Sequence, residues 1–327
     1  MTASAPRVSV ILPVLNEEDE LDEALQRIAS QSYQDFEVLV ADGGSCDATC
    51  RIVEEWCERD PRFQLLHNPR KLQSAGLNTA LTEARGEYLV RLDGHSFIED
   101  DYVERCVELL DTTGAEVAGG RMVPVPGSSP VARGIALANQ SPWGAGPARF
   151  HTGGESGPAE TVYLGSFRTD RVWELGGWSE NVGVNEDYEL NHRIRRAGGV
   201  VWLDIDLATG YRPRGSFRAL TRQYARYGRS KATVMRRHPD SARLRQVLPA
   251  LLAPALLGMG SRRLRPLVTA MLLFHATLVV LGAVRSPSHS PPDRAAGSLA
   301  AWLMHWSWSI GFWWGVVSPF PAAGESP

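Results

Sequence analysis

VSVILPVLNEEDELDEALQRIASQSYQDFEVLVADGGSCDAT, residues 8–49, carries the clearest signal of the fold. It opens with a mostly apolar run, as expected for a parallel strand that is buried on both faces. An amphipathic helix follows, with acidic residues near its N-terminus, where the helix dipole favours them. A second apolar run, 36–42, ends in Asp42 and a Gly-Gly-Ser turn. The order strand, helix, strand indicates the start of an α/β domain.

The same alternation continues along the chain. The next predicted elements are helix 46–59, strand 63–68, helix 74–84 and strand 87–93. Because strands that alternate with helices form parallel sheets, the sequence predicts a doubly wound, mostly parallel sheet. Further on, the stretch 141–160 is rich in Gly and Pro. It is either a mobile loop near the active site or a disordered insertion.

Charge limits the classes of partner. The chain has 34 Lys and Arg against 37 Asp and Glu, a formal net charge of -3, which excludes a nucleic-acid partner held by bulk charge. Arg and Lys concentrate in 212–265, which suits phosphate groups or an anionic membrane surface, or is a solvated helix face. The first residues lack a basic start followed by an apolar run, so we expect the N-terminal domain to stay in the cytoplasm. The sequence carries no signal of oligomeric state.

Two C-terminal stretches are uncharged. Residues 266–284 are long enough to cross a bilayer. Residues 298–320 are also uncharged and contain five Trp residues, a type that prefers the membrane interface. We predict two membrane-spanning or re-entrant helices, preceded by an interfacial helix. The alternative is a helical hairpin that packs on the soluble domain.

Polar residues follow several of the predicted elements. They are Asn16 and Glu17 after the first strand, Asp42 after the second, Asp93 and His95 after the fourth, and Glu186 and Asp187 at the start of a later helix. Ligands of open parallel sheets bind at the C-terminal ends of the strands, so we expect these side chains to converge. Converging carboxylates suit a substrate that carries hydroxyls, a base and a metal-bound diphosphate. Taken singly, acids at a helix start are as often caps, and Asp93-Gly94-His95 is either a metal site or a turn.

Four motifs together resemble the family-2 glycosyltransferases, which have the GT-A fold. They are the stretch 8–49, EYLVRLDGHS (87–96), FRTDRVWELGGWSENVGVNEDYELNHRIRRAGG (167–199) and RQYARYGRSKATVMRRHP (222–239). The second stands where the family has its Asp-x-Asp motif, the third resembles its Glu-Asp block, and the fourth its Gln-x-x-Arg-Trp segment. The resemblance covers about residues 7 to 240. Within the family, the succinoglycan-biosynthesis-type glucosyltransferases are the most similar subgroup.

The resemblance implies a role for each matching residue. Pro13, Asn16, Glu17 and Asp42 would line the nucleotide pocket, with Asp42 accepting a hydrogen bond from the uracil ring N–H. Lys71, or Arg70 beside it, would reach the diphosphate, although Lys71 is equally well explained as a solvated loop charge. On the acceptor side the implied residues are the base Asp187, Glu186 beside it, and Gln223, Arg226 and Tyr227, with Tyr227 in place of the family's Trp.

The metal motif is also assigned through the resemblance. Asp93 would contact the sugar or the metal, and His95 would be the second metal ligand. An imidazole nitrogen beside a carboxylate favours Mn2+ over Mg2+, and since histidine binds metal only when neutral, we expect affinity to fall below about pH 6.5. The competing hypothesis is that His95 donates a hydrogen bond to phosphate and the metal is held elsewhere or is absent.

A single base implies a single displacement with inversion. We predict that the enzyme moves a sugar, taken as glucose from the subgroup, from a UDP-sugar to a polyprenyl-diphosphate-linked saccharide. The reaction would serve extracellular polysaccharide or cell-envelope glycan synthesis at the cytoplasmic face of the membrane. The alternatives are a polyprenyl-phosphate sugar synthase and a non-catalytic, membrane-anchored nucleotide-sugar-binding module. The predicted domains are a GT-A domain, 1–240, with halves 1–125 and 126–240, and a membrane-associated helical region, 241–327.

Overall fold

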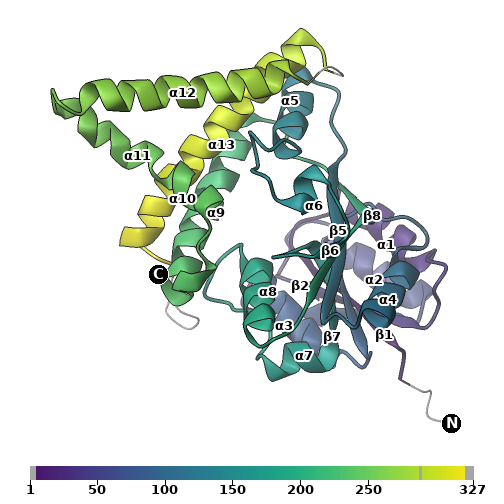
Figure 1. The fold of residues 1–327 in the computed structure, drawn as a ribbon. Coiled ribbons are helices and arrows are strands. Elements are labelled where there is room, and N and C mark those ends of the chain that lie inside the picture. Colours follow the sequence, from purple (N-terminus) through teal and green to yellow (C-terminus); the bar gives the residue numbers. More distant parts are fainter. Residues whose placement is uncertain (1–4, 287–288, 321–327) are drawn as a thin grey trace. The chain divides into compact units, whose positions relative to one another are not determined.

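A computed structural model describes residues 5–286 and 289–320 (Figure 1). Residues 1–4, 287–288 and 321–327 of the two predicted domains lie outside the described residues. The chain forms two compact units. The first comprises Met1–Met122, Gly153–Glu180 and Glu186–Tyr211, and the second Val123–Thr152, Asn181–Asn185 and Arg212–Pro327. Both units draw on separate stretches of the chain, and the predicted boundary at residue 240 stays a prediction.

The first unit is built on one eight-stranded sheet. Its strands are β1 (Val8–Val14), β2 (Phe36–Asp42), β3 (Phe63–His67), β4 (Tyr88–Arg91), β5 (Val117–Pro124), β6 (Gly157–Pro158), β7 (Tyr163–Arg168) and β8 (Val201–Tyr211). They lie in the order β3-β2-β1-β4-β7-β5-β8-β6. The first four pair in parallel, while β7 runs antiparallel to both β4 and β5, and β6 antiparallel to β8. The predicted doubly wound α/β sheet is confirmed, with a mixed second half.

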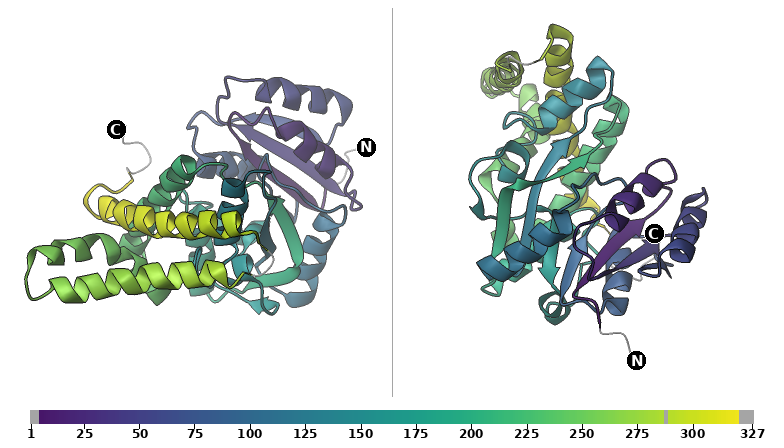
Figure 2. Two further views of the ribbon diagram at one scale, coloured as in Figure 1. Left: turned by 90° about the horizontal axis from the view of Figure 1, so that it is seen from above. Right: turned by 90° about the vertical axis from the view of Figure 1, so that its right-hand side faces the viewer.

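Helices cover both faces of the parallel strands (Figures 1 and 2). The helices of this unit are α1 (Leu21–Ala29), α2 (Thr49–Arg59), α3 (Gln73–Glu83), α4 (Tyr102–Thr113), α7 (Thr169–Glu174) and α8 (Glu186–Arg196). Every second residue of a strand faces the same side. Accordingly, Val10 and Leu12 share one hydrophobic core with residues of α1, α2 and α4. On the other face Gly76 of α3 lies against Pro13 and Ala41, so close that an added Cβ would be 3.1 Å from Pro13.

The strand order places the polar strand ends together. The chain moves outward from β1 to β2 and β3, and then returns to the other side of β1 with β4. Open α/β sheets bind their ligands at such a reversal, beyond the C-terminal ends of the strands. Asn16 and Glu17 follow β1, and Asp93 follows β4. The residues that follow β1 and β4 therefore flank the position that the topology favours for a ligand.

The second unit is helical. Its elements are α5 (Pro130–Asn139), α6 (Arg149–Thr152), α9 (Phe217–Arg237), η1 (Pro239–Ser241), α10 (Leu244–Ala250), α11 (Leu252–Ala255), η2 (Leu256–Gly260), α12 (Arg265–Val284) and α13 (Pro291–Val317). Long helix α13 packs along α9 and α5. Glycines allow α9 and α13 to approach closely: a Cβ on Gly228 would lie 2.1 Å from the Trp308 carbonyl oxygen, and one on Gly311 2.0 Å from that of Ala225. Backbone therefore packs directly on backbone at this crossing.

Proline shapes the turn between α10 and α11. Pro254 has no N–H to bond the carbonyl oxygen of Ala250 four residues earlier. That oxygen instead accepts hydrogen bonds from Ser309 Oγ at 3.0 Å and Trp313 Nε1 at 2.7 Å. Two side chains of α13 thus replace the missing helix bond and hold α10 in place.

Among the described residues, α12 is the one helix long and apolar enough to cross a membrane, by length and composition. It matches the first predicted span, and 17% of its most apolar stretch is buried. The second predicted span, 298–320, lies mostly within α13, whose Trp, Ser, His and Gly residues keep it less apolar than such a helix. The prediction of two spans is therefore not supported for α13, which buries small residues such as Gly297 and Ala300. The Gly- and Pro-rich stretch 141–160 contains α6 and β6.

Candidate active site

The turn after β2 is organised by Asp42. Its carboxylate accepts hydrogen bonds from the backbone N–H of Gly44 at 2.8 Å and of Ser45 at 3.1 Å. Burial alone would raise the pKa of Asp42, but the hydrogen bonds from Ser45 and Gly44 outweigh it, so the pKa is lowered. Gly44 has φ of 79°, a left-handed conformation that glycine adopts without strain. Asp42 is thus ionised at neutral pH and fixes the shape of the turn.

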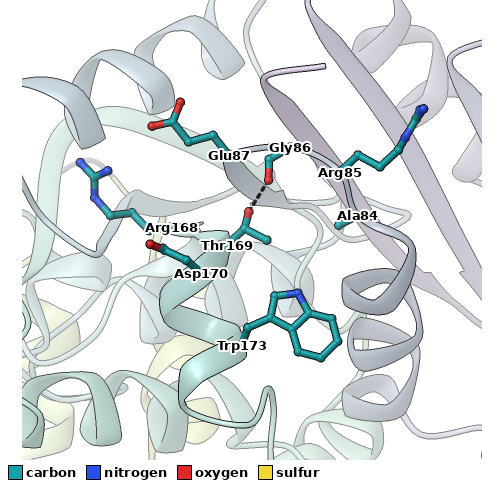
Figure 3. A pocket seen from close by; sticks show the side chains of 8 residues that line it. All are labelled: Ala84, Arg85, Gly86, Glu87, Arg168, Thr169, Asp170 and Trp173. Carbon is teal, nitrogen blue, oxygen red and sulfur yellow. Dashed lines mark hydrogen bonds between the residues drawn. The ribbon is translucent and has the colours of Figure 1, made fainter. Parts of the chain in front are cut away.

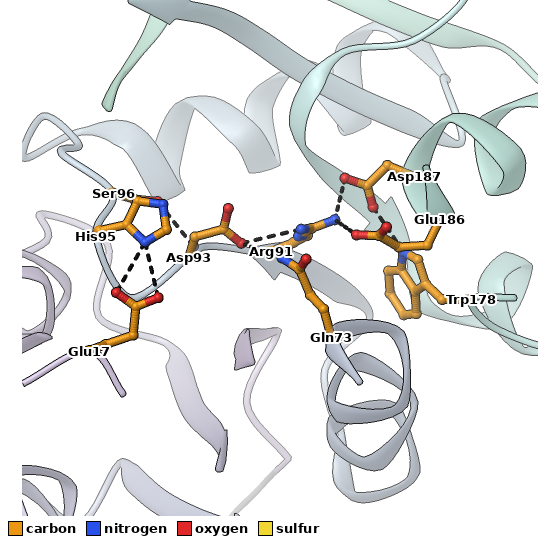
Figure 4. Close-up of polar contacts among 9 residues, drawn as sticks. All are labelled: Glu17, Gln73, Arg91, Asp93, His95, Ser96, Trp178, Glu186 and Asp187. Atoms are coloured by element: carbon orange, nitrogen blue, oxygen red, sulfur yellow. Dashed lines mark hydrogen bonds and ion pairs between the residues drawn. The ribbon is translucent and has the colours of Figure 1, made fainter. Parts of the chain in front are cut away.

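Asn16 and Glu17 connect the end of β1 to two other segments. Asn16 adopts a left-handed backbone, φ 54°, and its side-chain oxygen accepts the Cys46 N–H at 2.9 Å. The Glu17 carboxylate lies 3.2 Å from Nδ1 of His95 (Figure 4). The hydrogen bond with Glu17 raises the pKa of His95 despite its burial. Glu17, predicted to line the nucleotide pocket, therefore orients the histidine of the predicted metal motif.

Asp93 sits in a tight turn beyond β4. Its N–H donates to Ser96 Oγ at 3.0 Å, and its carboxylate accepts Gln73 Nε2 at 3.4 Å. Gly94 fills the middle of the Asp-x-His motif, where a Cβ would lie 3.2 Å from a Val14 methyl group. Within the described residues there is no group of three or more His, Cys, Asp or Glu side chains that could hold a metal ion. Asp93 and His95 therefore supply at most part of a coordination sphere.

A buried arginine joins Asp93 to the acids of α8. Arg91, the last residue of β4, is 3% exposed. Its Nη2 lies 3.2 Å from Asp93 Oδ1, and its Nη1 lies 3.3 Å from Glu186 Oε1 and forms an ion pair with Asp187 (Figure 4). The other carboxylate oxygen of Asp187 accepts Trp178 Nε1 at 3.1 Å. One cation thus holds three carboxylates from two segments of the chain.

The two acids of α8 differ in environment. The Glu186 side chain is 4% exposed and that of Asp187 25% exposed. Burial, together with the neighbouring Asp187 charge, raises the pKa of Glu186 to about 7, and its Oε2 has no hydrogen-bond partner. Burial also raises the pKa of Asp187, although the Arg91 charge opposes the rise. Asp187 is therefore the more accessible of the two acids, and Glu186 is almost fully enclosed.

Comparison with known proteins gives this geometry a context. The sequence model of the family described as Glycosyl transferase family 2 matches residues 9–170. Over 312 residues the chain is 33% identical to the succinoglycan biosynthesis protein ExoA of Rhizobium meliloti (strain 1021), with 93% of each chain covered. The chain belongs to the family-2 glycosyltransferases.

Solved structures confirm the GT-A fold of this glycosyltransferase. The mannosyltransferase PcManGT from Pyrobaculum calidifontis, solved with GDP-Man and Mn2+, is similar with a TM-score of 0.61 and 20% identity, covering 95% of this chain and 88% of that one. S. aureus TarS 1–349 in complex with UDP is similar with a TM-score of 0.51 and 16% identity, covering 90% of both chains. At these identities the likeness concerns the fold alone.

The structure separates the two cations proposed for the diphosphate. Arg70 forms an ion pair with Glu180, whereas Lys71 has a left-handed backbone, φ 57°. The Lys71 ammonium lies over the turn that Asp42 organises, 3.3 Å from where a Cβ of Gly44 would be. Of the two, Lys71 is the one that remains beside the residues predicted to line the nucleotide pocket.

The predicted acceptor-side residues Gln223, Arg226 and Tyr227 all lie on α9, in the second unit. Gln223 Nε2 donates to the Tyr227 hydroxyl at 3.0 Å, and Arg226 is exposed. Tyr227 therefore takes part in a local network with Gln223, one turn earlier on the same helix. Their relation to the acids of the first unit stays a prediction.

Sequence reasoning missed Arg91, Trp178 and Gln73. A signal for Arg91 was present, because a charged residue inside an otherwise apolar strand must find a buried partner. A hollow of about 540 Å3 lies at the other end of β4, lined by residues such as Arg85, Glu87 and Trp173 (Figure 3). None of the predicted site residues lines it.

Proposed function

We propose that this glycosyltransferase moves a sugar from a UDP-sugar to a lipid-linked saccharide, with inversion at the anomeric carbon. The observation that supports it most is the arrangement around Arg91: a partly exposed acid, Asp187, is held next to the donor-side acid Asp93. Asp187 takes the proton of the acceptor hydroxyl, which attacks the anomeric carbon opposite the diphosphate. No second carboxylate is needed as a nucleophile.

The proposed nucleotide site is formed by Asp42, by Lys71 and by the turn at Gly44 that both residues contact. The Asp42 carboxylate, ionised and positioned by backbone N–H groups, would accept the uracil ring N–H. Lys71 would contact the diphosphate as a positive charge. TarS was solved with UDP, whereas PcManGT was solved with GDP-Man, so the choice of uridine rests on Asp42 in this chain.

Asp93 and His95 would hold a divalent cation, and the donor diphosphate would supply further ligands. His95 has the arrangement of a metal-binding histidine, with one ring nitrogen oriented by the Glu17 carboxylate and the other available. A bound cation would neutralise charge on the leaving diphosphate. One nitrogen and one oxygen ligand favour Mn2+ over Mg2+.

The lipid-linked acceptor and the membrane location rest on the second unit. In α12, the side chains of Leu267, Leu273 and Phe274 are each more than 60% exposed. Large apolar side chains of a protein in water are usually buried, so this face indicates contact with lipid or another apolar partner. ExoA, which is similar over nearly the whole chain, is described as a succinoglycan biosynthesis protein. We infer a role in polysaccharide synthesis at the cytoplasmic membrane face, with glucose as the first donor sugar to test.

The test is transfer of label from a panel of UDP-sugars into the lipid extract of membranes that contain the protein. It is run with Mn2+, with Mg2+ and with chelator. Asp187→Asn should lower transfer by at least about 100-fold, because the base is lost, while UDP affinity stays within about twofold. The matched control is Asp170→Asn, an exposed acid of the same unit outside the site. Substantial transfer by Asp187→Asn, or consumption of no UDP-sugar by the unmodified protein, would contradict the proposal.

A further inference from the structure

Arg91 is unusual for its position at the end of a central strand. It occupies β4 between β1 and β7, and its side chain is 4% exposed. Buried arginines are retained only where their charge is paired, because an unpaired charge in a protein interior is costly. Its Nε has no hydrogen-bond partner, so the guanidinium is held through its two terminal nitrogens.

The two terminal nitrogens contact different parts of the site. Nη2 contacts Asp93, two residues further along its own chain segment. Nη1 contacts Glu186 and Asp187 at the start of α8. Glu186 is 95 residues from Arg91 in the sequence. A guanidinium is planar and rigid, so its two terminal nitrogens keep a fixed separation. The side chain therefore sets how far the donor-side acid is from the acids of α8.

A second arginine shows what a structural ion pair looks like in the same unit. Arg193, on α8, bonds Glu189 one turn earlier on the same helix and the carbonyl oxygens of Leu175 and Gly177. All of these partners belong to the framework, and none is a predicted site residue. Arg91 differs because every partner is an acid of the predicted site.

The orientation of the Asp187 carboxylate is also fixed. Trp178 holds one of its oxygens, and Trp178 is itself fixed, since its backbone N–H and carbonyl both bond the Asn78 side chain at 2.8 and 2.9 Å. Arg91 holds the other oxygen. The carboxylate is thus oriented from two sides by residues that are 1% and 3% exposed.

We propose that Arg91 is a positioning residue that fixes the distance between donor-side Asp93 and the base Asp187. The role rests on the proposed function of Asp187. Acceptor attack requires the base and the anomeric carbon to be aligned within a fraction of an ångström, and a displacement of about 1 Å can cost about 100-fold in rate. Arg91 touches neither donor nor acceptor in this role and acts through the two acids.

The kinetic test compares Arg91→Lys with Arg193→Lys in the full-length, membrane-bound protein. Lysine keeps the positive charge but offers a single nitrogen, which cannot bridge the two acids as the arginine fork does. Arg91→Lys should lower kcat by about 100-fold and leave KM for the nucleotide sugar within about threefold. Arg193→Lys should leave kcat within about threefold. Unchanged kcat in Arg91→Lys, or a loss that appears only in KM, overturns the proposal.

A second measurement does not depend on the reaction. Double-mutant cycles on the melting temperature pair Arg91→Gln with Asp93→Asn and, separately, with Asp187→Asn. Coupling in both cycles is expected, because one side chain contacts both acids, and coupling in only one cycle overturns the bridge. If the unmodified protein transfers no sugar, the proposed function fails, while these cycles still decide whether Arg91 joins the two acids. If Arg91→Lys does not fold, the same cycles take its place.

Discussion

The two units place their unusual side chains in opposite environments. The first buries charge: Arg91 and Glu186 are each 3% exposed. The second exposes large apolar groups: Leu257 is 84% exposed and Phe274 64%. Folded proteins in water ordinarily do the reverse. Each inversion indicates a partner other than water: in the first unit the buried charges pair with one another, and in our proposal lipid covers the exposed apolar groups of the second.

The units also differ in what holds them together. In the first, ion pairs and hydrogen bonds position groups whose burial would otherwise be unfavourable. In the second, α9 and α13 approach through Gly228, Gly311 and Gly315, with backbone against backbone. Charge substitutions should therefore affect the first unit most, and added side-chain volume the second.

The largest effect is expected at the helix crossing. Gly311→Ala places a Cβ about 2 Å from the Ala225 carbonyl oxygen, so the two helices must separate. We expect a loss of about 3 kcal/mol in stability, measured by thermal or denaturant unfolding in detergent. Gly215→Ala is the control, because Gly215 lies in the same unit and a Cβ there would meet nothing within 4 Å. Equal stability of the two variants would show that the crossing tolerates volume.

A smaller change, a gain rather than a loss of stability, is expected when Glu186 is replaced. The pKa of Glu186 is raised from 4.5 to about 7 by burial, so the folded protein holds a proton that the unfolded chain has released between those pH values. The free energy of unfolding therefore decreases as the pH rises through this window, and the decrease is complete above about pH 7. Glu186→Gln keeps the shape and removes the titration.

We expect Glu186→Gln to stabilise the protein by roughly 1–2 kcal/mol at pH 8 and by nothing at pH 4. Unfolding curves at the two pH values measure the difference. A variant that is less stable than the unmodified protein at pH 8 would mean that the Arg91 ion pair dominates the burial of Glu186.

Local pattern was enough to predict the framework of the first unit. Strand 36–42 has the predicted bounds, because an unbroken apolar run is needed where both faces of a parallel strand are buried. The acids after the strands were predicted for the same reason, since each follows the end of such a run. The contact between Glu17 and His95 was not predictable, because 78 residues separate them and only the strand order brings them together.

Two features of packing cannot be predicted from apolar character alone. The uncharged stretch 298–320 predicts a membrane-spanning or re-entrant helix, and the structure shows in addition that its small residues bury a close helix contact in α13. Arg91 lies inside the predicted strand 87–93, and a strand prediction assigns it no role because it depends only on which residues are apolar. Small residues at regular spacing and a charge inside a strand are both signals of packing that a sequence contains.

The smallest effect is expected on the exposed face of α9. Arg218, Arg222 and Arg226 are exposed and four residues apart, so they lie on one face, and like charges at that spacing slightly destabilise a helix. In the part of the chain that the structure describes, none of the three forms an ion pair with an acid. An anionic surface would offset this repulsion, which suits the membrane location proposed for the second unit.

Arg222→Gln should weaken binding to vesicles that contain an anionic phospholipid by about fivefold, since one arginine near such a surface contributes about 1 kcal/mol. Binding to purely zwitterionic vesicles should not change. The control is Arg51→Gln on α2 of the first unit, which removes the same charge from an exposed arginine paired with Glu55 at 2.7 Å. Equal weakening by both variants would mean that net charge, rather than the arginine face of α9, attracts the protein to the membrane.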